Sequence, residues 1–297
     1  MTALGLPRWA TPLALVGLVF VVGPVAALLV QADWPRLPAA LATPAALSAL
    51  GLTLVTALVS TAACVLLGLP AALALARCPP RAATWLRAVG LAPLVLPPMV
   101  SGVALLYWLG RRGLLGRVLA LGGITLPFTT AAVVVAQTFV ALPFLVVSAE
   151  GALRAVGDGY ARAAASLGAA PSRVFATVTW PLLAPALRGG VVLCFARALG
   201  EFGATALFAG NLPGHTQTMP LAIYTAFNGG GVGQDVAVAL SVVLIAVSIA
   251  LLAGSGALAP RAEGGRGART GTARLGRGRR TRDRAGAARL GGVDGTA

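Results

Sequence analysis

The sequence predicts an all-α protein that crosses a membrane about six times. Of its 297 residues, 58% are hydrophobic and only 10% are charged, whereas a soluble domain carries about 25% charged residues. Stretches without a charged residue, long enough to cross a bilayer, also recur along the chain. These observations exclude an ordinary soluble globular protein and indicate a polytopic membrane protein.

A helix needs about 20 apolar residues to cross the hydrocarbon core, because each residue advances it by about 1.5 Å. Six segments reach that length, so we expect spans at 12–30, about 46–76, 88–110, about 127–149, 189–209 and 236–258. The first is longer than the apolar region of a signal peptide, about 7–15 residues, and is therefore interpreted as a span. Pro93, Pro97 and Pro98 interrupt the third span and predict a kinked helix there.

Arginines in the short loops set the expected orientation, because they accumulate on the cytoplasmic side. The second and fourth connections hold seven of them: Arg77, Arg81, Arg87, Arg154, Arg162, Arg173 and Arg188. Both connections are therefore expected in the cytoplasm. Arg36 and the group Arg111, Arg112 and Arg117 then fall outside, against the rule. Either short external loops tolerate them, or they help an anion to reach the outer mouth.

Composition divides the chain into a membrane domain at 1–258 and an Arg- and Gly-rich tail at 259–297. The tail has too few large apolar side chains to offset its ordering entropy, so we expect a disordered cytoplasmic segment that can touch anionic lipid. The net charge of +15 is carried by arginine without lysine, which indicates compositional bias and not nucleic-acid binding. Cys64, Cys78 and Cys194 lack metal-ligand spacing, so no metal site is expected.

The segment between the fourth and fifth predicted spans is long for a connection and carries charge at helical spacing. Arg154, Asp158 and Arg162 are four residues apart, so they can pair along one helix face. Gly168 suits a left-handed helix end, and Pro171 suits the first turn of the next helix. The pattern predicts a short helix, a turn and a second helix.

This segment resembles the cytoplasmic coupling loop of ABC-transporter permeases. In that family two alanines are followed by glycine four positions later, an aliphatic residue ten beyond it and proline three beyond that. Ala163, Ala164, Gly168, Val178 and Pro181 match at this spacing, whereas Arg162 stands where the family usually has Glu. In the family this helix contacts an ATP-binding subunit, so the resemblance implies such a contact here.

The resemblance further implies the type I ABC importer transmembrane architecture, with 1–258 as the permease domain and 150–188 as the coupling loop. It implies a bacterial plasma-membrane location, a separate ATPase subunit, an extracytoplasmic oxyanion-binding protein and a permease homodimer. The sequence has no G-x-x-x-x-G-K-[ST] phosphate loop. We therefore expect a transport subunit and not an enzyme, with no cofactor bound directly and with ATP on the partner subunit.

Two charged residues, Arg197 and Glu201, lie four residues apart in the fifth predicted span and thus on one helix face. A lone charge at the bilayer centre costs about 2.5–3.5 kcal/mol on insertion scales, and pairing reduces that cost. The pair is either part of a pathway or gate, or a structural ion pair between helices. Gly200 and Gly203 permit close helix packing, which favours a subunit interface.

Residues 196–224 are similar to the molybdate branch of the ABC importers. Leu199–Thr205 fit its L-G-E-F-G-A-T motif, and Gly210–Tyr224 fit G-N-x-P-G-x-T-Q-T-x-P-x-A-I-Y. The sulfate and thiosulfate branch tends to have G-E-Y-G-S instead. The polar residues here are candidates for the pathway or the external mouth, or are ordinary loop residues: Thr205, Asn211, Thr216, Gln217 and Thr218.

Other functions remain open at this point. The substrate could instead be sulfate, thiosulfate or tungstate. A secondary transporter is less favoured, because no second copy of the coupling pattern is found where inverted repeats would be expected. A membrane-embedded enzyme is less favoured, because only five acidic residues precede the tail and none form a cluster.

Overall fold

The computed structural model describes residues 9–157 and 159–257, in which every regular element is a helix. In chain order these are α1 (Ala10–Gln31), α2 (Leu37–Leu41), α3 (Pro44–Arg77), α4 (Pro80–Gly90), α5 (Ala92–Val95), α6 (Pro98–Leu109), α7 (Gly116–Leu121), α8 (Thr130–Val156), α9 (Gly159–Ser166), α10 (Pro171–Val174), the π-helix η1 (Phe175–Thr179), α11 (Trp180–Leu199), α12 (Gly203–Phe208), α13 (Met219–Phe227) and α14 (Gln234–Ala257). The predicted tail at 259–297 lies outside the described residues.

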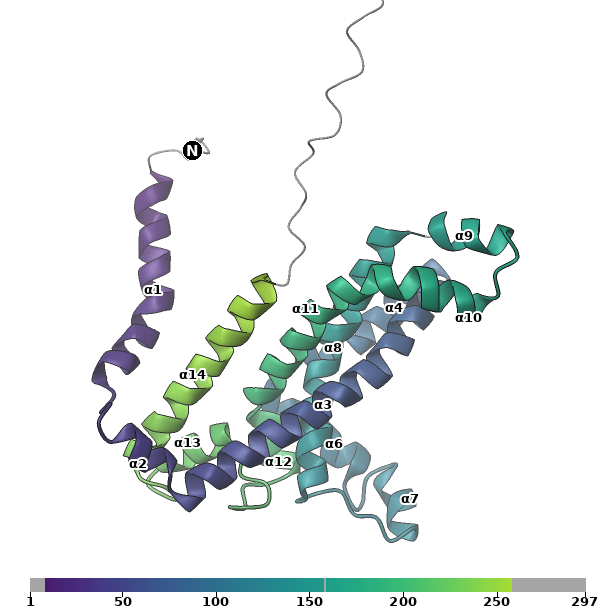
Figure 1. The fold of residues 1–297 in the computed structure, drawn as a ribbon. Coiled ribbons are helices and arrows are strands. Elements are labelled where there is room, and N and C mark those ends of the chain that lie inside the picture. Colours follow the sequence, from purple (N-terminus) through teal and green to yellow (C-terminus); the bar gives the residue numbers. More distant parts are fainter. Residues whose placement is uncertain (1–8, 158, 258–297) are drawn as a thin grey trace, which may run out of the picture. The chain divides into compact units, whose positions relative to one another are not determined.

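Three long helices, α3, α8 and α11, pack together at the centre of this unit, where small residues allow close approach (Figure 1). A Cβ atom added to Gly68 on α3 would lie 2.9 Å from the Leu145 side chain of α8. One added to Gly190 on α11 would lie 2.7 Å from Ser148 of α8. Tight van der Waals packing of this kind holds spans together, because lipid is as apolar as the side chains themselves.

Polar side chains within α3 satisfy their hydroxyl groups on the helix backbone. Thr53 donates to the carbonyl of Ala49 at 2.6 Å, and Thr61 donates to that of Ala57 at 2.7 Å. Such bonds are needed because the hydrocarbon core offers no water to these groups. An apolar helix can therefore carry buried hydroxyls without losing its place in the membrane.

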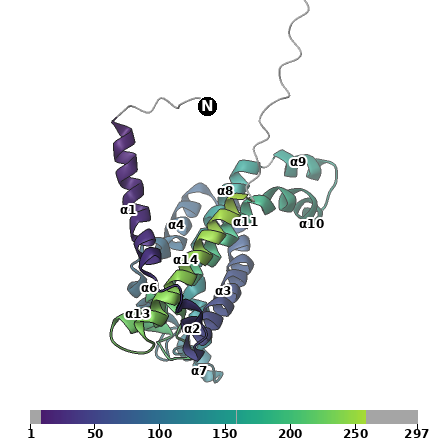
Figure 2. The same ribbon diagram turned by 60° about the vertical axis from the view of Figure 1, so that its left-hand side comes forward.

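The short elements gather at two opposite ends of the helical bundle, as the two views agree (Figures 1 and 2). Helices α4, α9 and α10 lie at one end, and α2, α7 and α13 lie at the other. Helix α12 packs on α6 and α8, and α13 packs on α14 and α3. The predicted coupling loop and the predicted external mouth thus belong to opposite ends of this unit.

The structure corrects the predicted spans in their bounds. Four described helices, α1, α3, α8 and α14, are long and apolar enough to cross a membrane by themselves. A fifth candidate is the bent pair Pro171–Pro185 and Leu187–Leu199, whose halves meet at 55°. Proline explains such a bend, because it removes a helical hydrogen bond and its ring clashes with the preceding turn.

The third predicted span, 88–110, is divided into separate helices. Helix α5 ends at Val95, and α6 begins at Pro98 and is an apolar helix of only 12 residues. Prolines occupy first-turn positions here, where a missing N–H is not needed. The predicted interruption by proline is present, but the segment forms separate helices and not the single kinked helix that the sequence predicts.

Candidate coupling and translocation sites

Helix α9 carries Arg162, Ala163 and Ala164 and is attached to the end of α8 through Gly157. Gly157 has φ 64° and ψ 178°, a conformation open to glycine without strain. None of the α9 residues is buried, and the apolar side chains at its two ends, Tyr160 and Leu167, are 67% and 89% exposed. Asp158, the predicted partner of Arg162, lies outside the described residues.

The turn after α9 has the conformation that the sequence predicts. Gly168 has φ 82°, its N–H donates to the carbonyl of Ala165, and the N–H of Ala169 donates to that of Ala164. These two bonds form a Schellman motif, in which a left-handed residue closes the helix end. Pro171 then begins α10. The left-handed glycine and the proline start are confirmed, whereas contact with another subunit stays a prediction.

The second half of the predicted coupling loop is helical, and the predicted second helix is therefore present. Val178 lies in η1 and Pro181 in the first turn of α11, and α10, η1 and α11 follow one another without a gap. Helix α8 likewise extends to Val156, beyond the predicted start of the loop at Glu150. The segment 150–188 thus contains the end of α8, all of α9, α10 and η1, and the first half of α11; its bounds as a coupling loop stay a prediction.

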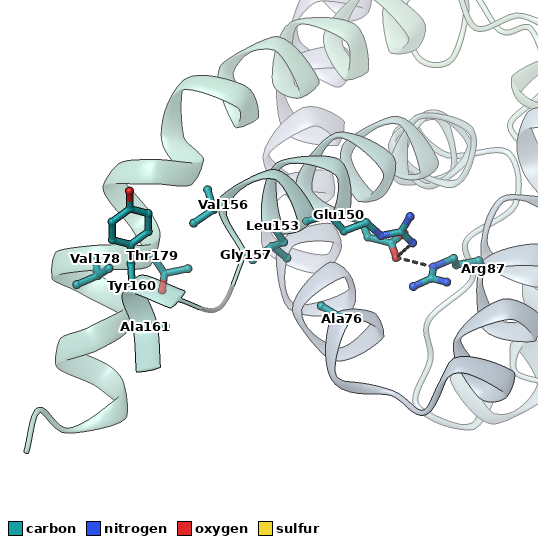
Figure 3. Close-up of a pocket in the computed structure, with 11 residues that line it drawn as sticks. Ala76, Arg87, Glu150, Leu153, Val156, Gly157, Tyr160, Ala161, Val178 and Thr179 are labelled. Carbon is teal, nitrogen blue, oxygen red and sulfur yellow. Dashed lines mark hydrogen bonds and ion pairs between the residues drawn. The ribbon is translucent and has the colours of Figure 1, made fainter. Parts of the chain in front are cut away.

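A buried carboxylate lies where α8 approaches α4, beside the base of α9 (Figure 3). Arg87 Nε of α4 donates to Glu150 Oε1 at 2.5 Å, and Arg154 Nη2 donates to the same oxygen at 2.7 Å. The Glu150 side chain is 9% exposed, against 29% for Arg87 and 63% for Arg154. Sequence reasoning missed this cluster, because 63 residues separate Arg87 from Glu150. The spacing in the sequence instead predicts that Arg154 pairs with Asp158.

The same region contains a cavity of about 350 Å³ between the bundle and the coupling segment. Arg87, Glu150 and Ala76 line it from the bundle side, while residues of α9 and η1, including Tyr160 and Thr179, line it from the other (Figure 3). The coupling segment is thus not packed tightly against the bundle along this face.

The predicted pair of Arg197 and Glu201 is present, but the helix that was expected to carry both ends between them. Arg197 Nη1 lies 2.7 Å from Glu201 Oε2, while α11 ends at Leu199 and α12 begins at Gly203. The span expected at 189–209 is therefore wrong in its bounds. Glu201 Oε1 also accepts the backbone N–H of Ala204 at 2.8 Å, so one carboxylate joins the end of α11 to the start of α12.

The small residues next to this pair have different surroundings. Gly203 is buried against α6 of the same chain, where an added Cβ would lie 2.5 Å from Pro98. Gly200 is exposed, and a Cβ atom added to it would meet only the carbonyl oxygen of Ala196, at 3.8 Å. Thr205 is fully buried in α12. Close packing at Gly203 thus occurs within the chain, and a subunit contact at Gly200 stays a prediction.

The predicted mouth residues form a hydrogen-bonded loop at the end opposite to α9. Asn211 is exposed, donates to Thr225 Oγ1 at 2.7 Å and accepts from Gln217 Nε2 at 3.0 Å. Thr216 Oγ1 accepts the N–H of Leu212 at 2.9 Å. Thr216, Gln217 and Thr218 are buried. These bonds engage Asn211, Thr216 and Gln217 in shaping the loop, whereas Thr218 Oγ1 has no hydrogen-bond partner among the described residues. Only Asn211 of the four faces outward.

Two further polar contacts fix this end and the bundle interior. Thr53 Oγ1 of α3 accepts the N–H of Met219, the first residue of α13, at 2.8 Å. Deeper in the bundle, Ser60 Oγ donates to Gln137 Oε1 of α8 at 2.9 Å. The sequence signal for these residues was their polarity inside uncharged runs, but their partners lie 166 and 77 residues away.

Comparisons with known proteins agree with this architecture. The molybdenum transport system permease protein of Mycobacterium tuberculosis (strain ATCC 25618 / H37Rv) is 51% identical over 255 residues, which cover 86% of this chain and 96% of that relative. The corresponding protein of Escherichia coli (strain K12) is 44% identical over 158 residues, which cover 53% of this chain and 69% of that relative.

A solved structure shares the fold at low sequence identity. The crystal structure of a bacterial ABC transporter involved in the import of the acidic polysaccharide alginate matches with a TM-score of 0.61 and 14% identity, covering 85% of this chain and 93% of that chain. A family model described as binding-protein-dependent transport system inner membrane component matches residues 65–263. This match and the 51% identical relative show that the chain belongs to the family of inner membrane components of binding-protein-dependent transport systems.

Proposed function

We propose that this chain is the membrane-spanning permease subunit of an ATP-driven importer of molybdate in the bacterial plasma membrane. The observation that carries the substrate is the relative at 51% identity over 86% of the chain, which is named for molybdenum transport. The L-G-E-F-G-A-T and P-G-x-T-Q-T patterns at 199–205 and 213–218 support the same substrate.

Energy for transport is proposed to come from a separate ATPase subunit that binds α9. The exposed helix offers a small surface at Ala163 and Ala164, with Tyr160 and Leu167 at its ends. The chain has no lysine and hence no phosphate-loop lysine of its own. Arg162 is exposed on this surface, so the ATPase would meet a cation where it usually meets a glutamate.

The substrate is proposed to arrive on an extracytoplasmic binding protein at the end that contains the 211–218 loop. A tetrahedral dianion is recognised by N–H and O–H donors and needs no cationic pocket along its path. Asn211 and His215 are exposed residues of that loop whose side chains carry N–H donors. The pathway itself is proposed to lie between two copies of this chain in a homodimer, with lipid around the remaining apolar surface.

Reconstitution tests this function directly. The chain, its ATPase and its binding protein are placed in liposomes, and uptake of labelled molybdate is measured with ATP inside. Uptake should require ATP and the ATPase, and excess tungstate or molybdate should compete more strongly than sulfate. Uptake driven by an ion gradient without the ATPase would contradict the proposal by indicating a secondary transporter.

Sulfate is the second candidate substrate, because the motif at 200–204 differs only modestly from that of the sulfate branch. Equal competition by sulfate and molybdate would move the assignment to a general oxyanion importer. Stronger competition by sulfate or thiosulfate would replace molybdate as the substrate while leaving the permease role intact.

A further inference from the structure

The ion-pair cluster of Arg87, Glu150 and Arg154 connects α8, the helix that precedes α9, with α4. Helix α4 packs mainly on α3 and α5. Arg87 extends from it to Glu150 on α8, in the penultimate turn before Gly157. The bond therefore fixes the end of α8 to α4 at the place where the coupling segment begins.

The geometry makes Arg87 the more effective of the two partners. Both arginines donate to the same carboxylate oxygen, but Arg87 is less than half as exposed as Arg154. Water screens an exposed ion pair and leaves it little net effect, whereas a buried carboxylate that loses its partner stays desolvated without compensation. Loss of Arg87 should therefore disturb this site more than loss of Arg154.

The segment from α9 to η1 joins the bundle at two places: Gly157, which leads back to the end of α8, and η1, which continues into α11. Helix α9 packs mainly on α10 and η1, and the cavity of about 350 Å³ lies between it and the pair Arg87 and Glu150. Gly157 lies directly after α8 at φ 64°, a backbone conformation that residues with a side chain rarely adopt. Movement of α9 can reach α11 through η1. Its effect on α8 depends on how firmly the end of α8 is held, because a free end moves without displacing the rest of the helix.

We propose that Glu150, held by Arg87, is a positioning residue for coupling: it keeps the end of α8 in place so that movement of α9 is transmitted to the membrane helices. This inference rests on the proposed function for its transport readout. Glu150 and Arg87 are not among the positions of the family motif, and neither lies in α9. Neither residue is placed in contact with the substrate.

The experiment compares three variants in the complete reconstituted complex: Arg87→Gln, Glu150→Gln and the double variant. Co-purified ATPase per permease measures assembly, and molybdate transported per ATP hydrolysed measures coupling. Both single variants should assemble and transport about 2- to 30-fold less molybdate per ATP, the range expected for a residue that links two sites. The double variant should recover part of the loss, because it leaves no unpaired buried charge.

A second readout does not depend on the substrate. A spin label is placed at Leu167→Cys, an 89% exposed site beyond α9, in a background with Cys78→Ser; Cys64 and Cys194 are buried. The label should become more mobile in Arg87→Gln and Glu150→Gln. Arg36→Gln is the matched control, since it removes an ion pair to Asp33 whose partners are 79% and 52% exposed.

The outcomes separate the two proposals. If the wild-type complex imports a different oxyanion, the substrate assignment fails and the label still reports on Glu150. Unchanged molybdate per ATP, or unchanged label mobility, in assembled single variants would overturn the positioning role. If neither the single variants nor the double variant assembles, the cluster acts only as a folding contact. That result also overturns the positioning role.

Discussion

Glu201 bridges two helices by using both of its carboxylate oxygens, one on Arg197 at 2.7 Å and one on the N–H of Ala204 at 2.8 Å. The Glu201 side chain is 1% exposed and that of Arg197 is 28% exposed. The acid therefore depends on these partners more than the arginine does, because an ionised group out of water must be compensated locally. Because Glu201 lies between α11 and α12, its contacts with Arg197 and Ala204 help to fix the non-helical residues 200–202.

Replacing Glu201 with Ala should destabilise the protein by about 3–5 kcal/mol, the usual cost of removing one partner from a buried ion pair. Arg197 then lacks its counter-charge, and the N–H of Ala204 loses its acceptor. Thermal unfolding of the purified permease and its yield as an assembled complex measure the effect. Asp33→Ala, which breaks an exposed pair with Arg36, should change stability little; equal effects of the two substitutions would show that Glu201 is not buried in the assembled protein.

Gly168→Asp should impair coupling by opposing the left-handed turn after α9. Gly168 has φ 82°, and an added Cβ would meet nothing within 4 Å. The cost is thus conformational, about 1–2 kcal/mol for an L-residue in this region. Molybdate uptake and ATPase stimulation by the loaded binding protein should both fall.

Gly168→Asn provides the matched comparison, because asparagine enters the left-handed region more readily than most residues. Asn should retain more activity than Ala at this position, although Ala is the smaller residue. The reverse order, or wild-type ATPase stimulation in Gly168→Asp, would show that the turn conformation does not govern docking.

Local features of the chain were predictable from the sequence, because they depend on neighbouring residues. Gly168 and Pro171 take the predicted conformations for this reason, and Arg197 and Glu201 remain within reach although the helix between them ends. Arg36 is another local case: it pairs with Asp33 at 3.2 Å, and such a pair reduces the charge conflict that its predicted outer position presents.

Contacts between distant segments were not predictable from a single sequence. Arg87 and Glu150 meet only because α4 and α8 are brought together by the fold. The polarity of Thr216 and Thr218 makes them candidates for the pathway or the mouth, but it does not indicate that the fold buries both side chains. Four of the six predicted spans overlap helices that are long and apolar enough to cross a membrane: 12–30, 46–76, 127–149 and 236–258. The other two, 88–110 and 189–209, are divided between shorter or bent helices at prolines and at the α11–α12 break.

Gly203→Ala should destabilise the contact between α12 and α6. The added Cβ would lie 2.5 Å from Cβ of Pro98 and 3.0 Å from its backbone carbon, and neither is a flexible side-chain end that can move aside. Overpacking of this kind costs about 1–3 kcal/mol. Gly51→Ala, where an added Cβ meets nothing within 4 Å, should leave the melting temperature unchanged or raise it. Equal melting temperatures for the two variants would contradict the close α6–α12 packing.

Thr53→Val should loosen the start of α13 at the end that contains the 211–218 loop. The hydroxyl of Thr53 accepts the N–H of Met219 at 2.8 Å while donating to the carbonyl of Ala49. Valine keeps the shape but leaves a buried N–H without an acceptor, which costs about 1–3 kcal/mol. Hydrogen exchange should accelerate at the first amides of α13, and the melting temperature should fall.

Thr61→Val on the same helix is the control. Thr61 is buried, and among the contacts of the described residues it donates only to the carbonyl of Ala57 in its own helix. If both variants exchange alike at α13, Thr53 does not anchor that helix, and the loop must be held by the Asn211, Gln217 and Thr225 contacts instead.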